Sequence, residues 1–557
     1  MRKIYSLVLM ATMLLMGANA WADDKSVGTP ADLVSAFTNI PSTRTITLTN
    51  DVELLAEHTA NPLIIEDGQE VTLNLNGYNL KGYTDPVFRV WHGKLIITGT
   101  GTFTSRVDAV VIKGSTDPAA ENYSVLEVGE NVNIVGTNSD YILFVTANGH
   151  SAYGAKMIVN GHVTSAKTGL YINGNVNETT GNVPEIYVNG TVVAGSGYAG
   201  IYAAGYGKWF IKGNVSGTTG IYAKAGIIEV SDNAHILATA TTYVEPDANG
   251  NGYTGGDGCA IIQDSKNGYA GGMVLHVTDN ATIESQTTDG TGYAINEVKT
   301  DASQSKTENI IIESGTITGN IDMTGEVQEQ VVLNGTITGG TFSTDISEYL
   351  DPTKGALEQT ANGYEVVEGC VAMLNSYGLA TFSSPNYNVV LPEGVTAWIA
   401  TGGMTNDALN LTKVAEAGGI LPKEAGLILY SETEASVNLN LYKSIADAVN
   451  VMGNLLKPAK AWETESFTEA YILHGNELWI YNGTTFKAGK AFLPMTAIST
   501  TSAPQRIRMV FNQEQNATAV ENVEAESVKA VKFMGEDGQL YIRRGDVVYT
   551  VQGQVVK

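Results

Sequence analysis

Cysteine is scarce in this sequence: Cys259 and Cys370 are the only two in 557 residues. They are 111 residues apart and lie in segments of different character, so we do not expect them to form a disulfide. Without such covalent links, stability must come from buried apolar surface and from backbone pairing.

Positively charged residues are also few. The chain carries 32 Lys and Arg against 58 Asp and Glu, which gives a net charge of −26. A surface of this sign repels the phosphate backbone, so nucleic acid is excluded as the main partner. The excess of acidic residues is explained by a need for solubility outside the cell, or alternatively by the attraction of calcium ions.

Long apolar runs are missing after the first residues. Arg2 and Lys3 precede an uncharged apolar run over residues 4–16, and Ala20-Trp21-Ala22 follows it. This pattern predicts a secretory signal peptide over residues 1–22. No later stretch reaches 18 apolar residues, so we expect no membrane span in the mature protein. The predicted location is secreted or on the outer cell surface.

The sequence is instead rich in glycine, with 61 residues, and in short apolar strands. Units such as KMIVNGHVTS, EIYVNGTVVAG and NIIIESGTITG combine a strand of about five residues, a turn on Asn-Gly or Ser-Gly, and a second strand. Such turns could be hairpins of a sandwich or corners of a parallel β-helix. The recurrence of similar strands favours the β-helix, and it predicts an all-β protein with a smaller β-rich, sandwich-like domain after it.

The composition and pattern of the sequence change several times after the repeats. We expect the β-helix over residues 23–350, a connector over 351–369 and a β-rich C-terminal module over 370–511, with a short helix near 443–454. An acidic linker over 512–527 and a short β C-terminal segment over 528–557 complete the predicted organisation.

A second repeat reads TGLYING, AGIYAAG, TGIYAKAG, DGCAIIQD and TGYAINEV. When these segments are aligned on their glycines, the first and third residues after each glycine face the same side of the strand and are apolar, so we interpret them as core residues. Cys259 is one of them and is interpreted as a small core residue rather than a nucleophile. The residue between these two positions faces outward, and in three of the segments it is Tyr171, Tyr202 or Tyr222. An exposed row of tyrosines would suit stacking on sugars. The row ends at Ala260 and Ala294, which favours the alternative that the rings stabilise the sheet by packing on one another.

Three segments resemble known families. EVTLNLNGYNLKG and the units after it resemble pectate-lyase-like right-handed parallel β-helices, which are common in secreted proteins of anaerobic gut bacteria. GGILPKEAGLILYSE and AYILHGNELWIYNG resemble a β-rich module near the C-terminus of large surface proteins from the same bacteria. GQLYIRRGDVVYTVQGQVVK resembles a shortened C-terminal sorting segment of type nine secretion cargo. The resemblance implies a secreted or surface-displayed protein, and it does not imply an enzyme.

The stretch from Asp247 to Asp257 has some features of a calcium loop. Asp247, Asn249 and Asn251 alternate as in an EF-hand, but Gly258 stands where that loop needs a bidentate glutamate. A looser calcium site that adds Asp257 and an ordinary polar turn are both compatible with this pattern. Calcium is the only cofactor that the sequence suggests.

Catalytic patterns are incomplete. GGDGCAI resembles the aspartate turn of polygalacturonases, but it has glycine in place of the second aspartate that hydrolysis needs, and no histidine follows. A lyase would need a base, and the candidates are the cluster Arg89, Lys94, Arg106 and Lys113. The simpler interpretation is that these four side chains are solvated on the surface.

We therefore expect a non-catalytic, adhesin-like or glycan-binding protein whose partner is an extracellular glycan or a host or bacterial surface component. The alternatives are a polysaccharide lyase or glycoside hydrolase on the same fold, and a structural spacer.

Overall fold

The computed structural model describes residues 24–147, 151–246, 255–265, 268–269, 271–298, 308–323, 336–405, 408–459, 470–481, 483, 488–498, 504–512, 531–534, 540–544, 547–550 and 556. The predicted signal peptide and most of the predicted acidic linker lie outside these ranges. Within the described part, no helix has the length and apolarity needed to cross a membrane.

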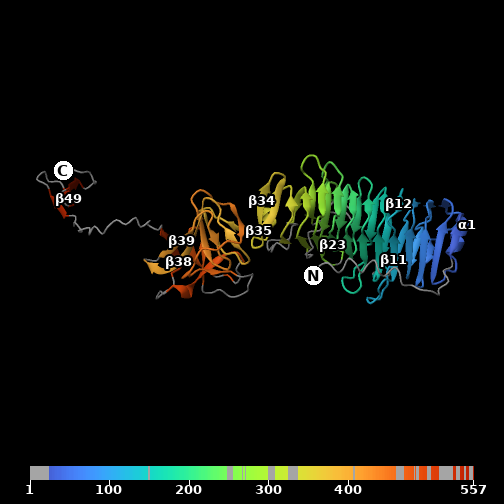
Figure 1. The fold of residues 1–557 in the computed structure, drawn as a ribbon, viewed down its shortest axis with the longest axis horizontal. Helices are drawn as coiled ribbons and strands as arrows, with labels where there is room; N and C mark the ends of the chain where they lie inside the picture. The colour runs from blue at the N-terminus through green and yellow to red at the C-terminus, as the bar shows by residue number, and fades with distance from the viewer. Residues whose placement is uncertain are drawn as a thin grey trace.

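The first and larger part of the chain is a parallel β-helix, as predicted (Figure 1). Successive strands go in turn to three parallel sheets, which we name A, B and C. Sheet A contains β1 (Lys25–Val27), β2 (Thr43–Leu48), β5 (Gln69–Asn74), β8 (Gly93–Thr98), β11 (Ser124–Val128), β14 (Ala155–Val159), β17 (Glu185–Val188), β20 (Lys208–Ile211), β23 (Gly226–Val230), β26 (Met273–Val277), β29 (Glu308–Ile312) and β32 (Thr336–Ile337).

Sheets B and C complete each coil. Sheet B contains β3 (Val52–Leu54), β6 (Leu80–Gly82), β9 (Gly101–Ser105), β12 (Val132–Gly136), β15 (His162–Ser165), β18 (Thr191–Val193), β21 (Asn214–Gly217), β24 (His235–Ala238), β27 (Thr282–Ser285), β30 (Thr316–Thr318) and β33 (Thr341–Phe342). Sheet C contains β4 (Leu63–Ile65), β7 (Phe88–Trp91), β10 (Val110–Lys113), β13 (Tyr141–Thr146), β16 (Thr168–Ile172), β19 (Ala199–Ala203), β22 (Thr219–Ala223), β25 (Cys259–Asp264), β28 (Tyr293–Val298) and β31 (Asn320–Asp322).

The core of the β-helix is built from columns of inward side chains. In sheet A, Leu126, Met157, Ile186 and Trp209 lie opposite one another on successive strands, and each is at most 1% exposed. Alternation along each strand sends every second side chain inward, and the next coil covers it. The register therefore also fixes which side chains line the outer faces.

A short helix, α1 (Pro30–Ala36), covers the N-terminal end of the stack (Figure 1). Thr29 caps its first turn by accepting a hydrogen bond from the Asp32 amide, and Leu33 packs fully buried in the core. The buried Arg44 guanidinium donates to the carbonyl oxygens of Ala36, Thr38 and Asn39, and so satisfies the end of the helix. This helix was not expected from the sequence.

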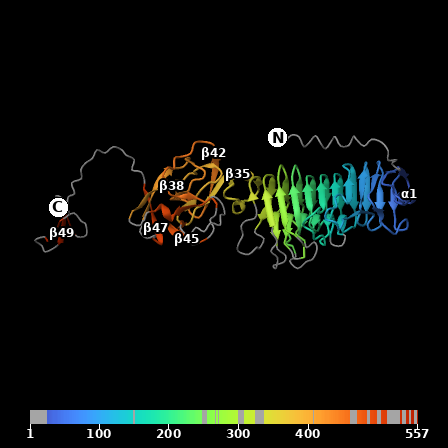
Figure 2. The same cartoon turned by 90° about the horizontal axis from the view of Figure 1, so that it is seen from below.

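Antiparallel strands follow the other end of the stack. The 3-10 turn Ser347–Tyr349 leads to the hairpin of β34 (Gly355–Thr360) and β35 (Gly363–Met373). β35 pairs antiparallel with β33 of sheet B and, further along, with β42 (Asn438–Ser444) of the next unit. The long strand β35 therefore belongs to both the β-helix and the C-terminal unit. Figure 2 shows these two parts of the chain in line.

The C-terminal unit is a separate β structure, as predicted. Its remaining elements are β36 (Leu379–Phe382), β37 (Asn388–Val390), β38 (Val395–Thr405), β39 (Ala408–Ala415), β40 (Ile420–Leu421), β41 (Leu427–Ser431), β43 (Lys457–Pro458), β44 (Ala470–His474), β45 (Glu477–Tyr481), β46 (Ala491–Pro494), the 3-10 turn Met495–Ala497 and β47 (Arg506–Asn512). A further three-stranded sheet contains β48 (Val531–Met534), β49 (Leu540–Arg544) and β50 (Val547–Thr550).

The helix expected over residues 443–454 is wrong. β42 continues to Ser444, and irregular chain follows it. Val449 and Val451 both pack against the core of the C-terminal unit, whereas Ile445 is 98% exposed. The apolar side chains that reach the core are two residues apart, which is the spacing of extended chain rather than of a helix.

Candidate functional site

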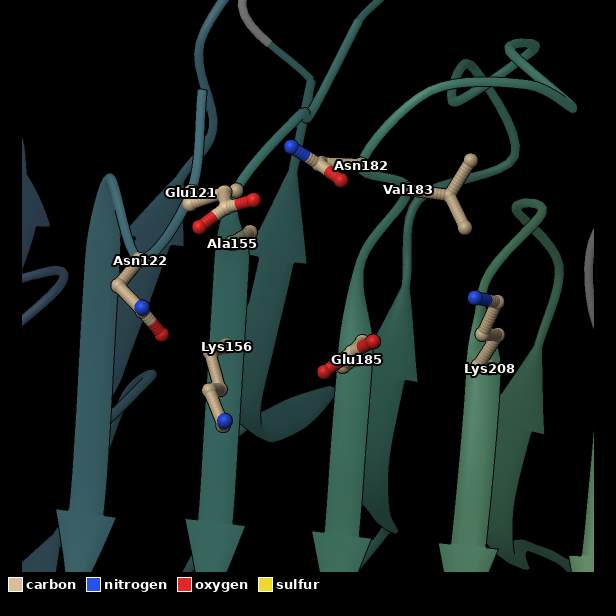
Figure 3. A pocket seen from close by; sticks show the side chains of 9 residues that line it. Glu121, Asn122, Ala155, Lys156, Asn182, Val183, Glu185 and Lys208 are labelled. Carbon is tan, nitrogen blue, oxygen red and sulfur yellow. The ribbon is translucent and has the colours of Figure 1, made fainter. Parts of the chain in front are cut away.

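A hollow of about 200 Å³ lies on the outer face of sheet A (Figure 3). Lys156, Glu185 and Lys208 form part of its lining from three neighbouring strands, β14, β17 and β20. They are paired in register, so they lie side by side on successive coils. Each is partly exposed, because its position in the strand alternates with the core column.

The upper wall of the hollow comes from the loops that enter these strands. It is formed by Glu121 and Asn122, which precede β11, and by Asn182 and Val183, which precede β17. The hollow thus combines two ammonium groups, two carboxylates and two carboxamides. Its formal charges balance, and it offers hydrogen-bond donors and acceptors together.

Backbone contacts hold this wall in place. The Asn182 amide donates to the Pro118 carbonyl, and its side chain donates to the Ala119 carbonyl at 3.2 Å. Gly154, which also lines the hollow, donates its amide to the Asn182 carbonyl at 2.8 Å. Its φ is +68°, and a Cβ there would lie 2.8 Å from the Ala120 carbonyl oxygen. This close approach requires glycine.

An aromatic pair borders the hollow on the same face. Tyr187 and Phe210 lie opposite each other on β17 and β20, with their ring centroids 4.8 Å apart and the planes 19° from parallel. The Lys156 ammonium lies 4.9 Å from the Tyr187 ring centroid, and the Tyr187 hydroxyl donates to Glu185 at 2.9 Å. Burial and this hydrogen bond raise the pKa of Tyr187 to about 12. Both rings are partly exposed.

The predicted tyrosine row has a different environment. Tyr171, Tyr202 and Tyr222 do lie in register on sheet C. Tyr171 and Tyr202 stack at 5.3 Å, and Tyr202 meets Tyr222 edge to face at 5.8 Å. Tyr202 is 1% exposed and Tyr222 is fully buried. The structure therefore has the arrangement that the sequence favoured, in which the rings pack on one another, and not the exposed row: Tyr202 and Tyr222 have no free face for a sugar, whereas Tyr171 is partly exposed.

Loop residues explain this burial. Tyr202 and Tyr222 belong to a second apolar cluster on the outer face of sheet C, and Tyr243 and Tyr269 pack against it. Burial raises the pKa of the Tyr202 phenol. Strand alternation gave the correct face of the sheet, but it carries no information about loops that cover that face.

The glycine alignment of the repeats is also corrected. Ile221 lies opposite Ile261, not opposite Cys259, and Tyr222 lies opposite Ile262. Cys259 is fully buried, but it belongs to the outer cluster with the tyrosines rather than to the column in which the alignment placed it. The repeat containing Cys259 is therefore displaced by two residues relative to the preceding repeat, whereas the following repeat keeps the glycine alignment, with Tyr293 opposite Cys259.

The predicted calcium ligands fall mostly outside the described residues: Asp247, Asn249 and Asn251 all do so. Asp257 is described and half-buried, and its buried Oδ1 has no hydrogen-bond partner in the described part of the chain. In that part, no group of three His, Cys, Asp or Glu side chains is placed to hold a metal ion. The calcium site stays a prediction.

The basic cluster considered for a lyase does not share one sheet. Arg89 and Lys113 lie on sheet C, Lys94 lies on sheet A, and Arg106 follows β9 of sheet B. Lys113 lies 4.1 Å from the Trp91 ring centroid, and Lys94 approaches Glu127. The spacing in sequence therefore does not indicate a common site for these four cations.

The hollow itself was not predicted. Lys156, Glu185 and Lys208 begin three consecutive strand units, KMIV, EIYV and KWFI. Their alternating charge at one position of the repeat is the signal that would have placed them on one face. The loop residues Glu121 and Asn182 have no comparable signal, because their positions depend on contacts between coils. No protein-family model, curated protein or solved structure matches this chain.

Proposed function

We propose that this protein is exported and binds extracellular glycan chains on the outer face of sheet A. The observation that carries the proposal is the hollow lined by Lys156, Glu185, Lys208 and Asn182, with the Tyr187–Phe210 pair beside it. Sugar hydroxyls both donate and accept hydrogen bonds, and this lining supplies both partners. The two rings pack face to face, and their partly exposed edges add apolar contact for the C–H groups of a sugar.

Charge and size narrow the ligand class. Two carboxylates in the lining, Glu121 and Glu185, disfavour uronates and sulfated sugars, while the two lysines disfavour a cation. Pockets for drug-sized ligands span roughly 300–1,000 Å³. A hollow of about 200 Å³ fits one sugar unit. We therefore propose a neutral glycan that lies along the face and places one residue in the hollow.

The shape of the β-helix supports this role. Parallel strands are about 4.8 Å apart, so the side chains at one position form a regular row along the stack. A rigid row suits an extended repeating polymer and loses little conformational freedom on binding. The acidic composition and the signal-peptide pattern support the proposed location outside the cell.

A glycan array with the purified full chain tests this function. We expect binding to neutral, hydroxyl-rich glycans. Lys156→Ala should weaken it at least about tenfold, since a hydrogen bond from a charged donor contributes about 1.5–3 kcal/mol. Lys81→Ala, an exposed lysine on sheet B, is the matched control and should bind like the wild type.

Three outcomes would contradict the proposal. Equal binding by the Lys156→Ala and Lys81→Ala variants would exclude the hollow as the site. The absence of binding to any glycan would favour the structural spacer. Turnover of acidic polysaccharides with calcium, giving unsaturated uronate, would favour the lyase alternative instead.

A further inference from the structure

One ion pair in the β-helix is completely enclosed. Lys224 directly follows β22 and Asp264 ends β25, and these neighbouring strands pair in parallel. The Lys224 Nζ lies 3.4 Å from the Asp264 Oδ2, and both side chains are 0% exposed. In the other described ion pairs each side chain is at least 17% exposed. This pair therefore has a different environment from the surface pairs.

Tyrosine rings surround the Lys224 ammonium. Its Nζ lies 5.3 Å from the centroid of Tyr222, 5.0 Å from that of Tyr269 and 6.0 Å from that of Tyr202. The Tyr222 hydroxyl donates to the Asp264 Oδ2 at 2.7 Å, so it contacts the same oxygen as the lysine. An amine, a carboxyl group and a hydrogen-bond donor thus meet in a site from which water is excluded.

We propose that Lys224 and Asp264 become joined by an amide bond. The proposal is independent of glycan binding. A proton passes from Nζ to the carboxylate, and the lone pair of the neutral amine attacks Cγ. The new C–N bond forms, one C–O bond breaks, and the departing oxygen leaves as water with two of the three ammonium protons. An ammonium and a carboxylate thus give one amide and one water, and no oxidant or other co-reactant is needed.

The enclosure supports each part of this step. Burial disfavours separate charges, since bringing two ions out of water costs several kcal/mol for each ion. The amide removes both charges. The Tyr222 hydroxyl is placed to stabilise negative charge that develops on the departing oxygen, in the manner of other fixed donors. Exclusion of water also slows hydrolysis of the product.

The bond would have a clear structural effect. It would connect β22 to β25 across the long segment that separates them, part of which covers the tyrosine cluster. Cys259 and Cys370 are both free thiols and buried, so the described chain has no disulfide to perform this role. A covalent link here would hold the covering segment against sheet C and make the β-helix resistant to local opening.

Intact mass spectrometry of the folded, purified full chain tests the proposal. We expect a mass lower by one water than the sequence predicts. Trypsin should leave residues 213–266 as one peptide, uncut after Lys224 and also lighter by one water. Cleavage after Glu229 or Glu245 should leave the Lys224 and Asp264 fragments joined. A full mass with normal cleavage after Lys224 would overturn the proposal.

Two variants separate this bond from other losses of water. A succinimide at an Asp-Gly pair removes the same mass, but it leaves the Lys224 and Asp264 fragments unjoined and persists in Lys224→Arg. We expect Lys224→Arg to have its full calculated mass; the same loss of water in this variant would contradict the amide. Tyr222→Phe keeps the ring and removes the donor, so newly made protein should lose water more slowly; an unchanged rate would contradict the role given to Tyr222.

Discussion

Truncation of Tyr202 distinguishes a buried stack from an exposed binding row. Its ring lies between those of Tyr171 and Tyr222 and is 1% exposed. A buried aromatic side chain covers roughly 150–250 Å², and at about 25 cal/mol per Å² its removal costs about 4–6 kcal/mol. The unfolded chain already hides part of that area, so we expect Tyr202→Ala to lower the free energy of unfolding by about 3–5 kcal/mol.

Guanidinium unfolding followed by far-ultraviolet circular dichroism measures this loss, which should affect the transition of the β-helix. Tyr377→Ala is the control, because this ring is 56% exposed in the C-terminal unit, and it should change stability by less than about 0.5 kcal/mol. Glycan binding by folded Tyr202→Ala should match the wild type, since the proposed site lies on sheet A. An unchanged transition together with lost binding would refute the buried stack.

Three further predictions follow from single contacts. Gly154→Ala should lower the free energy of unfolding by about 1–3 kcal/mol and weaken glycan binding, because φ is positive and a Cβ meets backbone; glycan titration and denaturant unfolding measure both effects. Arg44→Met should destabilise the N-terminal coils by about 2 kcal/mol or more by leaving the carbonyls at the end of α1 unpaired, which faster hydrogen exchange in α1 would reveal. Tyr187 should ionise near pH 12, later than an ordinary phenol, in an absorbance titration compared with Tyr187→Phe. Its raised pKa contributes stability that is fully present below about pH 10 and is lost as the pH rises through about 12.

The architecture was predictable because it depends on a local, repeated signal. The alternation in KMIV, EIYV and KWFI fixes inward and outward positions, and similar units recur along the stack. Each coil can bury its apolar side chains only against a similar coil, so recurrence indicates the β-helix. The same logic gave the common register of Tyr171, Tyr202 and Tyr222.

The errors came from features that depend on distant contacts. The burial of Tyr202 and Tyr222 results from covering residues such as Tyr269, which the strand pattern does not contain. The two-residue displacement at Cys259 follows a long inserted segment, so Gly258 is not equivalent to Gly220, the glycine of the preceding repeat. Helix α1 carries recognisable signals, Thr29 as cap and Pro30 at the first turn, but it is too short for helical periodicity to identify.

The residues of the candidate site also divide into those that the repeat could have predicted and those that it could not. Its strand residues, Lys156, Glu185 and Lys208, could have been grouped from the repeat, because they hold one position on consecutive coils. Its loop residues could not, since Asn182 is positioned by hydrogen bonds to Pro118 and Ala119 from a loop more than 60 residues earlier. A binding site between coils requires the three-dimensional register.

Hydroxyl-radical footprinting with and without the best-binding neutral glycan tests the proposed site most directly. Tyr187 and Phe210 are partly exposed on sheet A and react readily with radicals, so bound glycan should protect them. Tyr377 and Trp479, which are exposed in the C-terminal unit, should react equally in both samples. Unchanged reactivity of Tyr187 and Phe210 with saturating glycan, or protection confined to the C-terminal unit, would contradict binding at the sheet A hollow.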